Sequence, residues 1–125
     1  MKVFVYGTLK EGYGNNRRLQ GHTKVGDFIV QGYKLYDCGF PVAWPSENEF
    51  IQGELWDIGE SQETLRSLDA LEAEGYMYNR TDIVARTPDG QEELAQMYVG
   101  HPKNWDLYHL AECPKNPDGA YVWSR

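Results

Sequence analysis

Cysteines and long apolar runs are scarce in this sequence. Only two cysteines occur, Cys38 and Cys113, and they lie 75 positions apart, which is not the spacing of a metal site. No apolar run approaches the roughly 20 residues that a membrane-spanning helix needs, and no secretory leader is recognisable. We therefore expect reduced thiols, a cytoplasmic location and no membrane partner.

Basic residues are also few. The 12 lysines and arginines stand against 19 aspartates and glutamates, for a net charge of −7. The one basic pair, Arg17-Arg18, is much smaller than the clusters with which proteins neutralise phosphates. The charge balance argues against nucleic acid as a partner. It leaves small-molecule ligands and the oligomeric state open.

The length and composition are those of one folded domain, which we expect to cover residues 1–125. Strand patterns outnumber helical ones, and Gly26, Gly32 and Gly53 interrupt them in a way that predicts bends or bulges. Pro45 is expected to end one strand, and Thr87-Pro88-Asp89-Gly90 predicts a hairpin turn. The expected strands cover residues 2–6, 23–36, 42–44, 50–58, 77–86 and 93–99.

One main helix is expected at about residues 61–73. Ser61 is suited to its N-cap, and Gly75 is expected to stop it. A short helical turn follows Gly14, with Asn15 or Asn16 as its expected cap. These elements predict an α+β fold, a small mixed or antiparallel β-barrel with one main helix packed on it. The aromatic tail beyond residue 100 is left unassigned.

Glu72 is the sharpest functional candidate in the helix. At about 100° per residue, Leu65, Leu68 and Leu71 form an apolar stripe, and Glu72 falls within about 40° of its centre. The last turn of a helix disfavours a carboxylate, and burial does so too. We predict a pKa raised toward neutrality, which suits a group that both accepts and returns a proton.

A structural interpretation of the same helix remains open. Glu72 could instead pair with Arg80 or fill the edge of the buried face. Glu74 lies on the exposed face, and Asp69 lies at the boundary, where local hydrogen bonding is the expected role.

Tyr6-Gly7-Thr8-Leu9 is the second candidate. A glycine directly after a buried strand lets backbone N–H groups converge on an anion such as a carboxylate, although an ordinary strand-ending turn has the same pattern. The three histidines lack the spacing of a metal site, and no serine or cysteine lies in a nucleophile motif. We therefore expect neither a metal nor a covalent mechanism.

Three motifs occur in order: Val3-Phe-Val-Tyr-Gly-Thr-Leu-Lys10, Gly53-Glu-Leu-Trp56, and Leu68-Asp-Ala-Leu-Glu72 followed by Tyr78-x-Arg80. Together they resemble the gamma-glutamylcyclotransferase-like superfamily, and especially its small branch, which includes gamma-glutamylamine cyclotransferase. The resemblance runs from about residue 3 to residue 98. It implies a small β-barrel with flanking helices and a pocket at one barrel end.

The resemblance also implies roles for individual residues. The loop Tyr6, Gly7, Thr8 and Leu9 would hold the α-carboxylate and amine of a gamma-glutamyl substrate, and Glu72 would be the general acid and base. Tyr78 and Arg80 are secondary candidates, for binding or for orienting Glu72.

The implied reaction, of the transferase or lyase type, cyclises the gamma-glutamyl group to 5-oxoproline, releases an amine or amino acid, and needs no cofactor. A non-catalytic module that binds a small carboxylate is the alternative on the same fold.

Overall fold

Five strands close into a mixed β-barrel in the computed structural model, which describes residues 1–124. The strand order is β3-β1-β5-β4-β2, and pairing of β2 with β3 closes the ring. β1 and β5 are parallel, whereas the other neighbours are antiparallel. The elements are β1 (Lys2–Val5), η1 (Gly14–Leu19), β2 (Thr23–Asp37), β3 (Pro41–Asp57), α1 (Gln62–Glu72), β4 (Tyr78–Arg86), β5 (Glu92–Gly100), η2 (Leu107–His109) and β6 (Ala111–Glu112). The predicted α+β barrel is confirmed.

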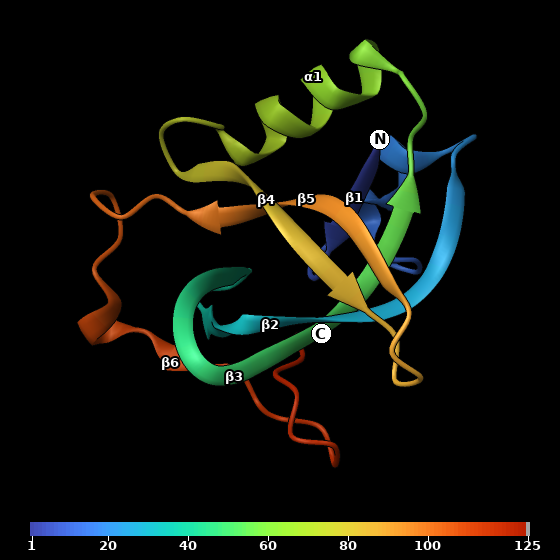
Figure 1. Cartoon of the computed structure of the whole chain (residues 1–125). Helices are drawn as coiled ribbons and strands as arrows, with labels where there is room; N and C mark the ends of the chain where they lie inside the picture. The colour runs from blue at the N-terminus through green and yellow to red at the C-terminus, as the bar shows by residue number, and fades with distance from the viewer. Residues whose placement is uncertain (125) are drawn as a thin grey trace.

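The longest pairing joins β2 and β3, which curve together around the barrel (Figure 1). Pro45 does not end a strand, so that prediction is wrong: β3 runs through it. Only Gly32 separates the paired residues Gln31 and Tyr33 on β2, whereas residues 46–49 separate their partners on β3. A proline, which has no N–H to donate, is tolerated at such an irregularity. The φ of +92° at Gly32 explains why glycine lies there.

Buried side chains form two clusters on the two faces of the barrel wall. Phe4 of β1 belongs to the first cluster with Leu35, Ile51 and Met97, whereas its neighbours Val3 and Val5 belong to the second, as the strand alternation requires. Leu68 of α1 is fully buried in the second cluster. The helix thus covers one side of the barrel (Figure 1).

The bounds of α1 follow from its caps. The Ser61 hydroxyl accepts a hydrogen bond from the Thr64 backbone N–H at 3.2 Å, which confirms the predicted N-cap. The helix ends at Glu72, close to the predicted end, but its C-cap is Ala73 and not Gly75: Ala73 has the left-handed φ of +47°, which alanine rarely adopts. The chain therefore turns away directly after Glu72.

The short turn η1 begins after Tyr13, and no side chain caps it. The predicted caps, Asn15 and Asn16, lie inside the turn. Their side-chain amides instead donate to Thr8 Oγ1 at 2.9 Å and to the Leu9 carbonyl at 2.8 Å. The turn therefore holds the loop that precedes it.

The aromatic tail is part of the fold. Tyr121 and Trp123 are buried in the first cluster, and the Trp105 indole donates to the Met77 carbonyl at 2.6 Å. Two residues of β6 extend the sheet at β2. None of the helices within residues 1–124 is long and apolar enough to cross a membrane.

Candidate active site

A cavity of about 400 Å³ lies where the loop after β1, the start of β3 and the C-terminal end of α1 meet. Residues from β4 and β5 complete its wall. The cavity brings together the two segments on which the sequence analysis focused. Its lining includes, of the candidate residues, Tyr6, Gly7, Thr8, Leu9, Glu72 and Tyr78.

Glu72 is the only carboxylate among the cavity-lining residues within residues 1–124, and no lysine, arginine or histidine lines the cavity with it. Burial raises its pKa from 4.5 to about 7, and the Arg18 guanidinium opposes that shift. No hydrogen-bond donor to the carboxyl is found among the described residues. Glu72 can therefore exchange a proton near neutral pH without first breaking a contact.

Arg80, the expected partner of Glu72 in the structural interpretation, pairs with Asp69 instead. Its Nη1 donates to both Asp69 carboxylate oxygens, and the Tyr98 hydroxyl donates to Asp69 Oδ1 at 2.7 Å. Arg80 lies outside the lining of the cavity. Asp69 thus has the structural role expected at the boundary of the helix face. Its ion pair with Arg80 keeps the Arg80 guanidinium from pairing with Glu72.

The loop is packed closely against the start of β3. A Cβ on Gly7 would lie 2.7 Å from Pro41 Cγ, so a larger residue would push the two segments apart. The Lys10 N–H donates to the Gly7 carbonyl at 3.0 Å and closes a turn. The backbone N–H groups of Thr8 and Leu9 have no acceptor within residues 1–124. Two free donors in a held turn form a place where an anion can bind.

Tyr6 and Tyr78, two of the three tyrosines that line the cavity, have engaged hydroxyls. Tyr6 donates to the Tyr98 carbonyl at 2.5 Å and accepts from the Ala43 N–H at 3.2 Å. Tyr78 donates to the Pro41 carbonyl at 2.9 Å. Burial raises the pKa of both hydroxyls well above the ordinary value. Both residues therefore serve as uncharged walls of the cavity.

Sequence reasoning missed the apolar part of the lining, which includes Phe40, Pro41 and Met77. Phe40 is 45% exposed, and its ring packs edge-on against Trp105 with centroids 6.2 Å apart. Trp105 also contacts the ring of Tyr78. Apolar residues of a cavity wall cannot be told from core residues in a sequence. The only feature that pointed to this wall was the unassigned aromatic tail, which contains Trp105.

No site for a metal ion was found among the residues that the structure describes. Within residues 1–124, no group of three or more histidine, cysteine, aspartate or glutamate side chains is close enough to hold one. The cavity-lining residues do not form a metal-ligand set either, because Glu72 is the only aspartate, glutamate, histidine or cysteine among those described.

Comparison with known proteins decides the family. Residues 3–122 match the family described as "Gamma-glutamyl cyclotransferase, AIG2-like". The chain belongs to this family. The gamma-glutamylcyclotransferase family protein YtfP of Escherichia coli strain K12 is 39% identical over 100 residues, which are 79% of this chain and 81% of YtfP.

Solved structures of gamma-glutamylcyclotransferase family proteins share the fold. The solution NMR structure of Escherichia coli ytfP has a TM-score of 0.68 and 33% identity and covers 98% of this chain and 96% of that protein. An aig2-like protein from Mus musculus has a TM-score of 0.69 over 99% of this chain and 95% of its own, and its 21% identity supports the fold alone. The resemblance inferred from the three motifs is thus confirmed, and with it the general enzyme class.

Proposed function

We propose that the chain is a gamma-glutamyl cyclotransferase-type enzyme that forms 5-oxoproline from a gamma-glutamyl compound and releases an amine or amino acid. The observation that carries this proposal is the position of Glu72. A carboxyl with a pKa of about 7 lines the same cavity as the loop at Gly7, Thr8 and Leu9. A carboxyl suited to proton transfer and a turn with two backbone N–H groups unbonded within residues 1–124 therefore border one cavity, as the proposed reaction requires.

The substrate would be held by its α-carboxylate at the loop. Support comes from the backbone N–H groups of Thr8 and Leu9, which have no protein acceptor in residues 1–124. The side-chain amides of Asn15 and Asn16 fix the loop from the side of η1. A five-membered ring closes quickly only when the amine and the carbonyl are held in near-attack geometry, so a rigid loop favours the reaction.

Proton transfer would proceed through Glu72. The carboxylate takes a proton from the α-ammonium group, and the freed amine attacks the γ-carbonyl carbon to form the new C–N bond. Collapse of the tetrahedral intermediate breaks the γ-amide bond, and Glu72 delivers its proton to the leaving nitrogen. Two protons in total leave the α-nitrogen, and both end on the released amine when it departs as an ammonium ion. No water is consumed.

The test is the substitution Glu72→Gln, which keeps the side-chain volume and removes the proton-transfer group. We expect 5-oxoproline release from a panel of gamma-glutamyl compounds to fall by about 10²- to 10⁴-fold, the usual contribution of a general acid and base. Glu63→Gln, in the exposed first turn of the same helix, is the matched control and should leave the rate unchanged.

Two results would argue against the proposal. Undiminished release by the Glu72→Gln variant would show that Glu72 is not the acid and base. Binding of gamma-glutamyl compounds by the unmodified protein, without turnover of any of them, would instead identify a non-catalytic module for small carboxylates.

A further inference from the structure

Glu54 on β3 is the one charged residue in the buried core of residues 1–124. It is paired in register with Val5, the last residue of β1, and therefore lies beneath the point where the loop leaves the barrel. Its neighbour Gly53 makes this possible, because a Cβ there would lie 2.4 Å from the Val5 carbonyl oxygen. The two strands approach as closely as their backbones allow.

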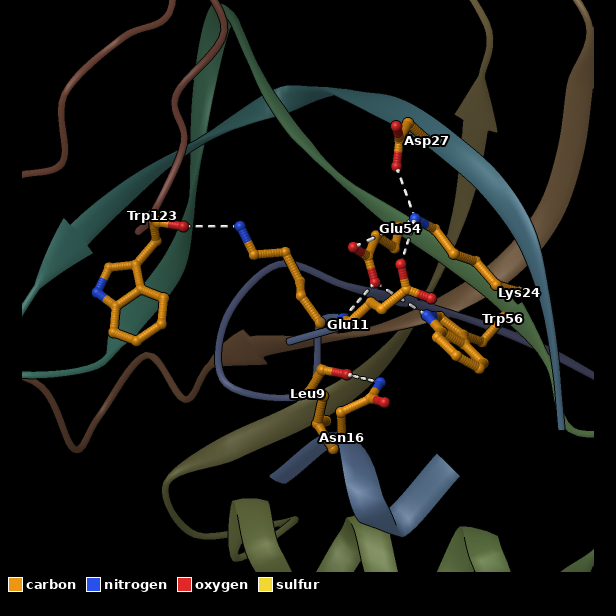
Figure 2. Close-up of polar contacts among 9 residues, drawn as sticks. Leu9, Glu11, Asn16, Lys24, Asp27, Glu54, Trp56 and Trp123 are labelled. Atoms are coloured by element: carbon orange, nitrogen blue, oxygen red, sulfur yellow. Dashed lines mark hydrogen bonds and ion pairs between the residues drawn. The ribbon is translucent and has the colours of Figure 1, made fainter. Parts of the chain in front are cut away.

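The Glu54 carboxylate is compensated on both oxygens. Oε1 accepts the Trp56 indole N–H at 3.1 Å, and Oε2 lies 3.5 Å from Lys24 Nζ. Burying an unpaired carboxylate would cost several kcal/mol, so these two partners are what allows Glu54 to be buried here. Figure 2 shows Glu54 between Trp56 and Lys24, with Asp27 on the far side of the lysine.

The third contact of Glu54 is to the loop. Oε1 also accepts the backbone N–H of Glu11 at 2.8 Å (Figure 2). Glu11 follows directly after the turn that the Lys10 N–H closes on Gly7. On the opposite side, the Asn16 amide donates to the Leu9 carbonyl. The turn that offers the Thr8 and Leu9 N–H groups is thus held to η1 by Asn16, and the residue after it is held to the barrel by Glu54.

Glu54 does not line the cavity, so it does not touch a molecule bound there. We propose that Glu54 is a positioning residue that holds the backbone donors of the loop in place for the substrate carboxylate by accepting the Glu11 N–H. The inference rests on the proposed function and deepens it. Charge-assisted hydrogen bonds to a backbone N–H are among the stronger ones, which suits an anchor for a loop.

The experiment compares three variants. Glu54→Ala removes the acceptor, and Glu54→Gln keeps an oxygen for the Glu11 N–H without the charge. Lys24→Met removes the ion pair to the same carboxylate, together with the longer one of 3.9 Å to the Glu11 side chain, and keeps the acceptor for the Glu11 N–H. Each variant is measured for KM and kcat with a gamma-glutamyl substrate, for the pH midpoint of kcat, and for hydrogen exchange of the Glu11 amide by NMR.

We expect Glu54→Ala to raise KM by about tenfold or more, because a small displacement of a positioning group is costly, with no change in the pH midpoint. Glu54→Gln should restore KM to near the wild-type value. Lys24→Met should lower stability without raising KM. Protection of the Glu11 amide should be lost in Glu54→Ala alone.

Three results would overturn the inference: an unchanged KM in Glu54→Ala, a Gln variant that behaves like the Ala variant, or a Lys24→Met variant with an equal rise in KM, which would show a general loss of stability. Binding of 5-oxoproline, measured by calorimetry, separates this inference from the proposed function. If the protein binds 5-oxoproline but forms none, the proposed reaction is wrong, and the affinities of the three variants for 5-oxoproline still test the role of Glu54. If the protein neither binds nor forms 5-oxoproline, both the proposed reaction and the positioning role of Glu54 are wrong.

Discussion

Asp69 and Arg80 form an ion pair on the side of α1 next to Glu72, so Arg80 pairs with Asp69 and not with Glu72. Arg80 Nη1 contacts both oxygens of Asp69, and Tyr98 adds a third hydrogen bond. Arg80, which lies two residues after the cavity-lining Tyr78, is therefore engaged. Glu72, three residues further along the helix, faces the cavity without an ion-pair partner at hydrogen-bond distance.

Arg80→Met tests this division of roles. The ion pair is partly exposed, with side-chain exposures of 24% and 29%, so its loss should reduce stability by about 1 kcal/mol in urea denaturation. Because Arg80 lies outside the cavity lining, we expect kcat/KM for a gamma-glutamyl substrate to change little. A large fall in kcat with unchanged stability would instead place Arg80 at the substrate.

Arg18 is the cation that acts on Glu72. It lies on η1 and donates to the Ser67 side chain at 2.9 Å, which ties the turn to the helix that carries Glu72. Its charge lowers the pKa of Glu72 against the larger effect of burial. Arg18→Met should therefore shift the rising limb of the kcat/KM profile to higher pH, because Glu72 must be ionised to accept a proton.

The control for this shift is Arg17→Met. Arg17 is the exposed neighbour on the same turn, so its removal changes the net charge equally without affecting the environment of Glu72. A shift of the same size in both variants would show that net charge, and not the position of Arg18, sets the midpoint.

The raised pKa of Glu72 has a consequence for stability. The unfolded chain ionises this group near its ordinary value of 4.5, whereas the folded chain keeps its proton until about pH 7. Between these values only the unfolded state releases the proton, so rising pH destabilises the fold. The full penalty, on the order of 3 kcal/mol for a shift of this size, is present above pH 7.

Glu72→Gln should abolish that penalty. We expect its thermal unfolding midpoint to match that of the wild type near pH 4.5 and to exceed it at pH 8. Glu63→Gln, which alters an exposed glutamate of the same helix, should show no such divergence. Equal midpoints at pH 8 would mean that Glu72 has an ordinary pKa in the folded protein.

The features that sequence reasoning predicted are those set by local chemistry. Ser61 caps α1 because its hydroxyl reaches the Thr64 N–H three residues on, and the helical period placed Glu72 toward the core. The hairpin between β4 and β5 follows from the turn at Gly90, whose φ is +90°. Each needs only residues within a few positions of one another.

The features that it did not predict depend on distant segments. Pro45 remains within β3 because β2 supplies an irregular pairing at Gly32, and the parallel pairing of Val3 with Gln96 has no local signal. Ala73 adopts a conformation that glycine would favour. Trp105 packs against the cavity-lining Phe40 from 65 positions along the chain, and only the folded chain brings the two together.

The apolar wall gives a prediction about the leaving group. The lining within residues 1–124 contains no basic side chain, and its one carboxylate, Glu72, repels a second anion when ionised. If the proposed reaction holds, gamma-glutamyl-phenethylamide should be a better substrate than gamma-glutamyl-phenylalanine, which differs only by a carboxylate on the leaving group. We expect a difference of about tenfold in kcat/KM, since a repulsion of about 1.4 kcal/mol corresponds to that ratio.

Phe40→Lys should reduce or reverse this preference, because it places a cation on the exposed apolar wall of the cavity. The gain should be in kcat/KM for gamma-glutamyl-phenylalanine, and it should weaken at high salt, which screens the new attraction. Tyr108→Lys adds the same charge at a position that is 98% exposed and outside the cavity lining, so it should leave the ratio unchanged. Equal turnover of the two compounds by the wild type would show that Glu72 does not repel a carboxylate on the leaving group. An equal effect of the two lysine variants would show that Phe40 does not contact the leaving group.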